Sequence, residues 1–441
     1  MDNDTILEKQ KKYMWGTWNY YQKPISIARG EGLYVWDTDG NKYLDMFGGM
    51  LTLSTGHCHP RVVEAIKQQV DKLIFAPSLY AHENAAVYAE MLAGITPPNL
   101  SRTYFALSGT EAVENAIKVA KQVTGAQEVI ALRGAYHGLS ALGMTLTAHP
   151  GFRWWGTNVA GVKHAVQPNC YRCAFHLTYP ECDVACARDI EEIILKTTSG
   201  RIAAFIAEPI AGVSGLITPP PEYFEVAVGI VRKYGGLFIA DEVQTMFGRT
   251  GKYWSGSQHW GVEPDVMPVG KSIASGMPLS ATITTPEIAD KLTGSIVSTF
   301  QAHPVSVAAA IASLEVLKEE DAPAHVAEIG AQIREGFEAL MDKYPLIGNI
   351  RGMGCMQGLE FVKDRATKEP AIEEMAELFE ATRKRGLLIG SGGTGNAFRF
   401  TPPLVTQKEH VEEAMDILDH AIAEVQEMAA KFPDRPDVVE N

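Results

Sequence analysis

The chain has 441 residues, of which 46% are hydrophobic and 21% are charged, a composition that is typical of a globular protein with a large core and excludes a disordered chain. Its 53 acidic residues outnumber its 39 lysines and arginines, which gives a formal net charge of −14. No local basic patch offsets this charge, so we expect neither nucleic acid nor an anionic membrane surface as a partner.

The sequence predicts neither a targeting segment nor a membrane span. Residues 1–10 carry acids and lysine and lack the apolar run of a signal peptide. The longest charge-poor stretches, residues 134–152 and 266–286, are interrupted by Gly, Pro, Ser, Thr and His. Six cysteines are too few for a disulfide scaffold. We therefore expect a cytoplasmic protein in a reducing compartment.

The first predicted elements form a hairpin. Apolar runs at residues 32–36 and 42–46 flank the turn-forming cluster Asp37-Thr38-Asp39-Gly40-Asn41. From about residue 60 the pattern changes to helices that alternate with short strands. The next predicted elements are helices at residues 61–73 and 84–94, a strand at residues 103–107, and a helix that follows Ser108-Gly109-Thr110.

Three compact apolar runs follow, at residues 129–132, 203–207 and 236–240. Helical segments at residues 190–196 and 223–234 lie between the later runs. Near-continuous apolar strands separated by helices predict a mostly parallel sheet that is covered on both faces, and hence an α/β fold.

The remainder of the chain predicts a second domain. After Pro304 come a long Ala-rich helix and then an α+β region that ends in an amphipathic helix at residues 408–430. We expect a large domain over residues 58–319. The smaller α+β domain is expected to be discontinuous and to consist of residues 1–57 and 320–441.

Residues whose side chains suit ligand binding or catalysis follow the predicted strands. Ligands of parallel sheets bind beyond the carboxyl ends of the strands, so those positions are the first candidates. Ser108, Gly109 and Thr110 close one strand and open a helix. Backbone N–H groups, the helix dipole and two hydroxyls there favour a phosphate site, with ordinary helix capping as the alternative.

The next three strands end in an aromatic or acidic residue. Tyr136 and His137 offer an aromatic face for a planar ligand, unless they only pack in a loop. Glu208 and Asp241 each end a buried apolar strand, where a carboxylate is costly unless a cation, hydrogen bonds or a ligand compensates for it. Because an uncharged run precedes Asp241, we favour a functional role over a structural ion pair.

Lys271 is the single charged residue between Asp265 and Glu287. Its apolar neighbours predict desolvation, which lowers the pKa of an amine and favours the nucleophilic free base. The alternative is a side chain that extends to solvent. Together, a phosphate cradle, a stacking aromatic ring, a buried carboxylate and a desolvated lysine are the four groups that pyridoxal phosphate needs in its binding site.

The sequence resembles one family over nearly its whole length. The matching motifs are Asp37-Thr38-Asp39-Gly40, Gly56-His57-Cys58-His59-Pro60, Ala207-Glu208-Pro209, Asp241-Glu242-Val243-Gln244 and Arg399. They resemble the class III (omega) aminotransferases of the type I pyridoxal-phosphate transferase fold, with the strongest regional similarity to alanine:glyoxylate and omega-amino-acid:pyruvate enzymes. The resemblance implies a ping-pong transfer of an amino group from an amine or an omega- or alpha-amino acid to a small keto acid.

The resemblance also implies residue roles. The catalytic residues would be Lys271, which forms the Schiff base, and Asp241, which pairs with the pyridinium nitrogen. The other cofactor-binding residues would be Ser108, Gly109 and Thr110 at the phosphate, Tyr136 and Val243 on the two ring faces, Gln244 at the ring hydroxyl, and His137 and Glu208 beside them. Thr299 would reach the phosphate across a subunit boundary, which implies a homodimer or a dimer of dimers. No metal is implied.

The substrate is less constrained. Arg399 resembles the arginine that binds the acceptor carboxylate, and Trp18, Tyr21 and Met50 are candidate pocket-wall residues, with packing as the alternative. In 4-aminobutyrate and ornithine enzymes a glutamate usually follows Glu-Pro-x-x-Gly, whereas Val213 stands here. This favours pyruvate or glyoxylate over 2-oxoglutarate as the acceptor. A racemase or a phospholyase with the same cofactor residues remains an alternative, and the amino donor is left open.

Two further motifs suggest other functions. Residues 390–395 fit the dinucleotide fingerprint Gly-x-Gly-x-x-Gly, but Phe398-Arg399-Phe400-Thr401-Pro402-Pro403 follows instead of a helix, so we reject a dehydrogenase. Four cysteines at C-x2-C-x8-C-x3-C spacing suggest a zinc loop, but we favour free or loop-stapling thiols; these are Cys170, Cys173, Cys182 and Cys186.

Overall fold

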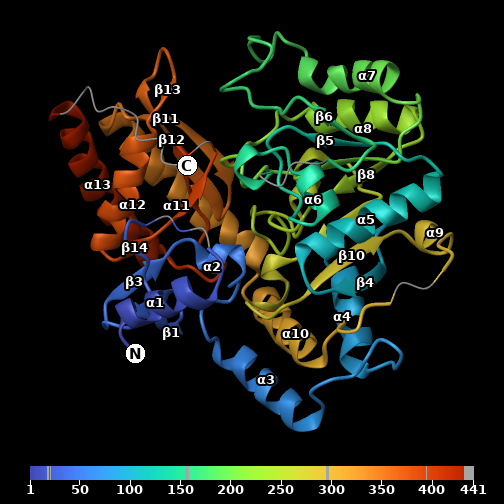
Figure 1. The fold of residues 1–441 in the computed structure, drawn as a ribbon, viewed down its shortest axis with the longest axis horizontal. Coiled ribbons are helices and arrows are strands. Elements are labelled where there is room, and N and C mark those ends of the chain that lie inside the picture. The colour runs from blue at the N-terminus through green and yellow to red at the C-terminus, as the bar shows by residue number, and fades with distance from the viewer. Residues whose placement is uncertain (17–18, 20, 154–157, 295–296, 394, 432–441) are drawn as a thin grey trace.

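The computed structural model describes residues 1–431 apart from residues 17–18, 20, 154–157, 295–296 and 394. Its strands form a seven-stranded sheet and two smaller sheets of four and five strands. Figure 1 shows the large sheet in one half of the molecule, in cyan to yellow, and the elements near both chain ends side by side in the other half, in blue and red. In the described part of the chain, no helix is long and apolar enough to cross a membrane.

The large sheet is mostly parallel, as the sequence predicts. Only β10 runs antiparallel, and it does so to both of its neighbours. Strands β6, β9 and β10 lie outside the strands that the sequence predicts. The order across the sheet is β4 (Arg102–Ala106), β10 (Ser280–Thr284), β9 (Val266–Val269), β8 (Leu237–Ala240), β7 (Ala204–Ala207), β5 (Val129–Leu132) and β6 (Val162–Ala165).

Helices cover both faces of this sheet because successive residues of a strand point to opposite faces. In β7, Phe205 packs into a cluster with α7 (Ala185–Thr197) and α8 (Tyr223–Lys233). The next residue, Ile206, packs into a second cluster with α5 (Gly109–Thr124). The fully buried pattern of β7 therefore reflects cover on two sides, which is why no polar residue alternates along it.

The four-stranded sheet joins the two ends of the chain. It consists of β1 (Ile27–Glu31), β2 (Tyr34–Asp37), β3 (Lys42–Asp45) and β14 (Leu387–Leu388). β2 and β3 form the predicted hairpin, and β14 pairs in parallel with β3. This pairing supports a discontinuous second domain. The bounds that we expect for the two domains stay a prediction.

The five-stranded sheet lies in the C-terminal part of the chain. It has the order β11 (Ile347–Met353), β12 (Met356–Asp364), β16 (Ala397–Phe400) and β15 (Gly390–Gly392), and β13 (Glu369–Pro370) pairs with β12. β15 and β16 are antiparallel, with Gly390 opposite Arg399. Within residues 390–400, as far as the structure describes them, a strand pair replaces the helix that a dinucleotide fingerprint requires, which confirms the rejection of a dehydrogenase.

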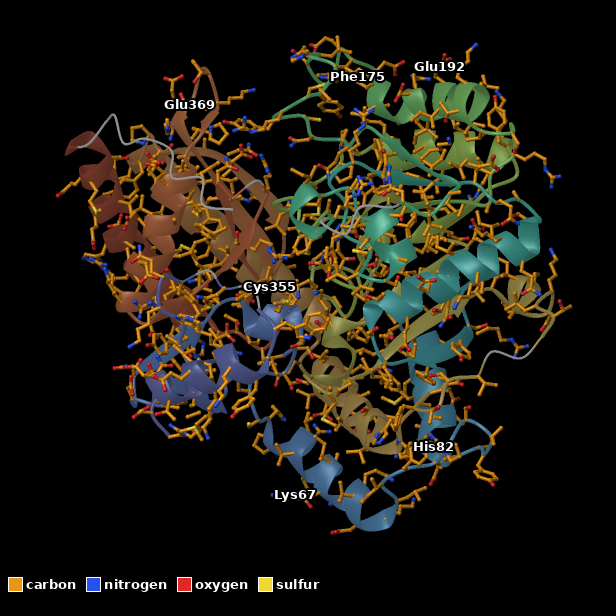
Figure 2. The ribbon with its side chains drawn as sticks, viewed as in Figure 1. Lys67, His82, Phe175, Glu192, Cys355 and Glu369 are labelled. Carbon is orange, nitrogen blue, oxygen red and sulfur yellow. The ribbon has the colours of Figure 1, made fainter. Side chains whose placement is uncertain are left out.

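The remaining helices fill the space around and between the sheets. They are α1 (Asn3–Tyr13), α2 (Gly48–Leu51), α3 (Pro60–Lys72), α4 (Glu83–Ala93), α6 (Ala141–Leu146), α9 (Pro286–Ala289), α10 (Pro304–Glu319), α11 (Ala322–Lys343), α12 (Ile372–Lys384) and α13 (Lys408–Lys431). α10 is the predicted Ala-rich helix and is apolar and buried around most of its circumference. Figure 2 shows the side chains that fill both halves of the molecule.

Candidate active site

Five parallel strands end at the same edge of the large sheet, and each is followed by a predicted site residue. Ser108 follows β4, Lys271 comes two residues after β9, Asp241 follows β8, Glu208 follows β7, and Tyr136 lies four residues beyond β5. Because these strands are neighbours or near neighbours, residues as far apart in sequence as 108 and 271 meet at one place.

A cleft with about 550 Å³ of empty space lies at this edge, within the size range of small-molecule sites. Eight of its lining residues are among the predicted cofactor-binding residues, and Val113 and Gly138 are not. The lining residues are Gly109, Thr110, Val113, Tyr136, His137, Gly138, Asp241, Val243, Gln244 and Lys271. The structure thus brings together most of the site that the sequence predicts.

The N-terminus of α5 forms one end of the cleft. Ser108 caps this helix, because its Oγ accepts a hydrogen bond from the N–H of Glu111 at 3.3 Å. Capping by Ser108 and a phosphate site are therefore compatible, since the first N–H groups of a helix have no partner within it. A Cβ at Gly109 would lie 2.9 Å from Cγ1 of Val243, so only glycine allows this close approach.

Asp241 and His137 form a buried carboxylate–histidine pair deeper in the cleft. Oδ2 of Asp241 lies 2.6 Å from Nδ1 of His137, and both side chains are almost completely buried. Oδ1 of Asp241 accepts a second hydrogen bond from the N–H of Val243. The backbone N–H of His137 donates to Oγ1 of Thr147 at 2.8 Å. The orientation of Asp241 is therefore fixed from two sides.

Glu208 supports the neighbouring wall. It accepts hydrogen bonds from the N–H groups of Tyr136 and Gly212, both at 3.0 Å, and from Nε2 of Gln244 at 2.9 Å. Burial raises the pKa of Glu208 to about 7; Asp241 adds to this effect and His137 opposes it. Among the described residues, Oε1 of Gln244 is buried without a hydrogen-bond partner. That oxygen is suited to accept a hydrogen bond from a ligand hydroxyl.

Lys271 follows Gly270 at the end of β9 and has a backbone φ of 42°, in the left-handed region. The pKa of its amine is lowered to about 8, mainly by burial and also by the positive charge of Arg399, while Glu208 and Asp241 act in the opposite direction. The amine is therefore in the free, nucleophilic form much more often at neutral pH than an ordinary lysine.

The cleft fits pyridoxal phosphate at each of the groups that this cofactor presents. The N-terminus of α5 would suit the phosphate, Tyr136 and Val243 line the cleft where a planar ring could pack, and Asp241 would supply an anion for a protonated ring nitrogen. The unpartnered Oε1 of Gln244 suits the ring hydroxyl. The free amine of Lys271 suits an aldehyde.

The predicted substrate-binding residues differ in where they lie relative to the cleft. Arg399 is 4% exposed and acts electrostatically on both Lys271 and Tyr136, so its charge is felt in the cleft. The ring of Tyr21 packs edge-on against Phe379 at 6.4 Å, which favours the packing alternative for it. Met50 is 51% exposed. Neither Tyr21 nor Met50 lines the cleft, and Trp18 lies outside the described residues.

Several residues that shape the site carried no signal in the sequence. Gly138 has a φ of +111°, and a Cβ there would lie 2.5 Å from Oγ1 of Thr110. Oγ1 of Thr147 accepts from the His137 N–H and donates to the Gly138 carbonyl oxygen. Phe152 packs edge-on against the ring of Tyr136 at 5.1 Å. A glycine directly after Tyr136-His137 is the one feature that could have indicated a close approach.

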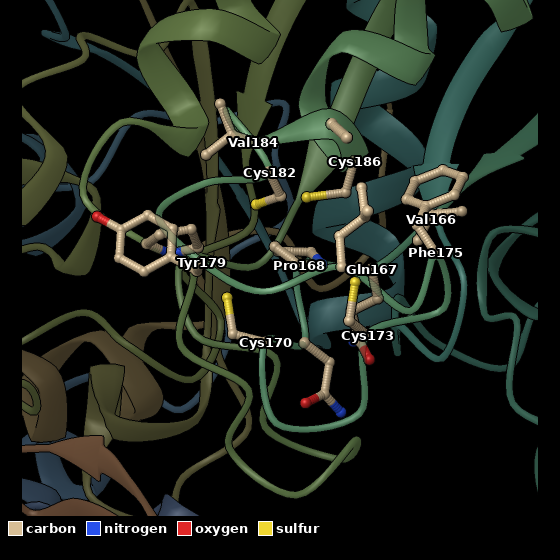
Figure 3. Close-up of a pocket in the computed structure, with 14 residues that line it drawn as sticks. Val166, Gln167, Pro168, Cys170, Cys173, Phe175, Tyr179, Cys182, Val184 and Cys186 are labelled. Carbon is tan, nitrogen blue, oxygen red and sulfur yellow. The ribbon is translucent and has the colours of Figure 1, made fainter.

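Four of the cysteines line a separate small cavity, three from the loop that precedes α7 and Cys186 from α7 itself, as Figure 3 shows. All four are free, and burial together with neighbouring thiols raises the pKa of Cys170 and raises that of Cys186 to about 12. In the described residues, no group of three or more His, Cys, Asp or Glu side chains is arranged to hold a metal ion. The expectation of free or loop-stapling thiols at Cys170, Cys173, Cys182 and Cys186 stays a prediction.

Comparisons with known proteins show the family to which the chain belongs. A model of the class-III aminotransferase family matches residues 17–422. The chain is 39% identical to "Alanine--glyoxylate aminotransferase 2 homolog 2, mitochondrial" of Arabidopsis thaliana, over 96% of this chain and 88% of that protein. It is 36% identical to "Alanine/serine racemase" of Pyrococcus horikoshii, over 95% of this chain and 90% of that protein. The crystal structure of an amine transaminase from an uncultivated Pseudomonas species in the PLP-bound form matches with a TM-score of 0.87 and 32% identity, over 94% and 98% of the two chains.

Proposed function

Because the chain belongs to the class-III aminotransferases, which depend on pyridoxal phosphate, we propose that it transfers an amino group from an amine or an amino acid to pyruvate or glyoxylate by a ping-pong mechanism. The observation that carries this proposal is the placement of Lys271, Asp241 and the α5 N-terminus around one cleft. An amine, an anion and a phosphate site in that arrangement suit this cofactor and its chemistry.

Each residue of the cleft has a role in this reaction. When bound, pyridoxal phosphate supplies a ring that withdraws electrons from the substrate's reacting carbon. Gly109 and Thr110 would bind the phosphate, while Tyr136 and Val243, which line the cleft, would confine the ring. Asp241 would hold a proton on the ring nitrogen, since an opposing charge within about 4–6 Å raises such a pKa by roughly 1–3 units.

Lys271 is both the covalent anchor and the proton carrier. With the cofactor bound, Nζ of Lys271 would hold its aldehyde group and, when free, would act as the general base that takes the proton of the donor carbon and as the general acid that gives it up again. A pKa of about 8 suits both steps, because a general acid–base group works best when its pKa is near the operating pH. The keto acid then runs the same steps in reverse.

Arg399 is the proposed carboxylate-binding residue. A planar guanidinium can form two parallel hydrogen bonds to a carboxylate, which a lysine cannot. Val213 stands where 4-aminobutyrate enzymes are expected to place a glutamate that holds this arginine, which supports a small keto acid as the acceptor. The Arabidopsis relative is named as an alanine–glyoxylate aminotransferase, and we extend this substrate class to the present chain.

Product analysis separates amino transfer from its alternatives. With a panel of amines and amino acids, we expect alanine to form from pyruvate, or glycine from glyoxylate, faster than glutamate forms from 2-oxoglutarate. Arg399→Met should raise KM for the keto acid about tenfold or more, as expected when a charge-assisted hydrogen bond is lost. Donor that is inverted or eliminated, with no amino acid formed from any keto acid, would instead identify a racemase or a phospholyase.

The racemase alternative has one specific observation in its favour, which is the similarity to the Pyrococcus protein. Chirality of recovered alanine therefore belongs in the same assay. Enantiomer exchange that occurs without a keto acid and outpaces amino transfer would favour racemisation as the main activity.

We also propose a homodimer. Exposed apolar side chains gather where the loop after α3 meets the loop before α10, and the rings of Phe75 and Phe300 are 5.5 Å apart there. The other exposed members are Leu73, Ile74, Leu79, Tyr80 and Val297. Thr299 is exposed beside this patch and does not line the cleft of its own chain, which supports a role at the phosphate of a second subunit.

The Phe300→Asp variant tests the homodimer. Light scattering should show a dimer for the unmodified protein and a monomer for the variant, whose Kd for pyridoxal phosphate should rise about tenfold as partner contacts are lost. Leu195→Asp is the matched control, because Leu195 is 53% exposed on α7, away from this patch. A monomeric unmodified protein would contradict the homodimer, and a monomeric variant with unchanged cofactor affinity would contradict the role of Thr299.

A reducing compartment, the cytoplasm, is our proposal for the location, supported by the six free cysteines. The Arabidopsis relative is named as a mitochondrial protein. Fractionation of the source cells would distinguish the two.

A further inference from the structure

The side chain of Arg399 is held along its whole length. Arg399 lies on β16, opposite Gly390 of β15. Its Nε donates a hydrogen bond to the carbonyl oxygen of Ser391 at 2.6 Å. A Cβ at Gly392 would lie 3.2 Å from Cγ of Arg399, so the aliphatic part of the arginine passes closely over a glycine. The course of this side chain is therefore defined before any substrate arrives.

The guanidinium at the end of that course lies over an aromatic ring. Cζ of Arg399 is 5.0 Å from the ring centroid of Phe47, within the range of a cation–π interaction. Phe47 is itself fixed, because its N–H donates to Oδ1 of Asp45 at 3.1 Å and its carbonyl oxygen accepts from Oγ1 of Thr401 at 3.3 Å. The ring is therefore a rigid support for the guanidinium.

Gly390 is required for this support. A Cβ at Gly390 would overlap Cε2, Cδ2 and Cζ of the Phe47 ring. Gly390 and Arg399 are paired across β15 and β16, so the same strand pair that positions the arginine also makes room for the ring beneath it. Gly390 thus has a packing role in a segment that resembled a dinucleotide fingerprint.

An aromatic ring differs from an acid as a partner for arginine. It holds the guanidinium by the ring quadrupole and leaves the positive charge in place. Arg399 still acts on the pKa of Lys271 and of Tyr136, which shows that its charge is felt in the cleft. A guanidinium held over a ring face therefore keeps its charge for an incoming carboxylate.

We propose that Phe47 is a positioning residue that seats Arg399 for the carboxylate of the keto acid, and that Gly390 is the residue that admits its ring. This inference rests on the proposed role of Arg399. Phe47 acts on carboxylate binding through the guanidinium and is not among the residues that line the cofactor cleft. Its loss therefore affects KM for the keto acid and leaves the chemical step intact.

Steady-state kinetics of the holoenzyme with pyruvate and with glyoxylate tests this inference. Phe47→Leu should raise KM for the preferred keto acid about fivefold, a size in keeping with a half-buried cation–π contact, and keep kcat within about twofold. Phe47→Tyr, the matched control, retains a ring and should stay within about twofold in both constants. Gly390→Ala should reproduce the KM increase, because the added methyl displaces the ring without changing Phe47 or Arg399.

A double variant shows whether Phe47 acts through Arg399. In the Arg399→Met background, Phe47→Leu should cause no further rise in KM, whereas an effect independent of the arginine would add to it. The inference is overturned if Phe47→Leu leaves KM unchanged, lowers kcat alone, or adds fully to Arg399→Met. If Phe47→Leu does not fold, an unchanged KM in Gly390→Ala overturns it. An unmodified protein that transfers nothing to either keto acid overturns the proposed function instead.

Discussion

Lys271→Ala should lose amino transfer almost completely while the protein still folds. We expect the turnover rate to fall by about 10⁴-fold or more, because the same side chain is the covalent anchor and the general acid–base group. The variant should bind pyridoxal phosphate only non-covalently, held by Asp241 and the α5 N-terminus. Borohydride treatment followed by mass spectrometry measures the covalent link directly: the unmodified protein gains the cofactor mass and the variant does not.

The pH dependence of cofactor capture gives a second measure of the same lysine. The amine must be unprotonated to attack an aldehyde, and burial lowers the pKa of Lys271 to about 8. The rate at which the apoenzyme forms the covalent link should therefore rise with pH, with a midpoint near 8. A solvent-exposed lysine would move that midpoint to about 10.4.

The lowered pKa of Lys271 also determines how the stability of the apoenzyme changes with pH. Between pH 8 and the pKa of an unfolded lysine, the unfolded chain binds one more proton at this position than the folded apoenzyme does. The Lys271 contribution therefore makes the apoenzyme more stable as pH rises through that window, and it is absent in Lys271→Ala. Thermal unfolding of the two apoenzymes across this pH range compares the slopes.

Lys233→Ala is the matched control for these measurements. Lys233 is exposed on α8 and pairs with Glu191 at 2.6 Å, so its removal should leave both the covalent link and the turnover rate unchanged. A Lys271→Ala protein that still gains the cofactor mass after borohydride would show that a different lysine carries the link.

The sequence predicts the site better than it predicts the sheet. Ser108, Asp241 and Glu208 each follow a short apolar run, so a local pattern combined with the rule for parallel sheets places them together. The same rule fails for β9, β10 and β6, which the sequence analysis did not predict. In β9 a proline interrupts the apolar run, and β6 carries Lys163 and His164 at the edge of the sheet, so neither resembles a buried strand.

Contacts between residues that are far apart in the sequence could not be predicted, for a different reason. Phe47 and Arg399 lie 352 positions apart, and nothing in either local sequence indicates the partner. The hydrogen bond between His137 and Asp241 is of the same kind. The arrangement of Tyr21 against Phe379 also depends on how the two chain ends fold together, which local periodicity does not encode.

Asp241→Asn should reduce amino transfer by about 10²- to 10³-fold. The amide is nearly the same size as the carboxylate and can still accept a hydrogen bond from Nδ1 of His137, so the geometry of the pair is retained. What is lost is the negative charge, and without it the pKa of a ring nitrogen nearby falls by roughly 1–3 units, which lowers the protonated fraction by a corresponding power of ten. Single-turnover rates of the donor half-reaction measure this effect apart from product release.

Glu242→Gln separates the charge of Asp241 from carboxylate burial in general. Glu242 is the next residue and is fully buried, but it accepts hydrogen bonds from the N–H groups of Gly256 and Ser257, away from the cleft. Its replacement should lower the free energy of unfolding by about 1–3 kcal/mol and leave the half-reaction within about threefold of the unmodified rate. If instead Asp241→Asn retained a third or more of that rate, the negative charge would not be what activates the ring. The cofactor would then owe its reactivity to Lys271 and the phosphate site alone.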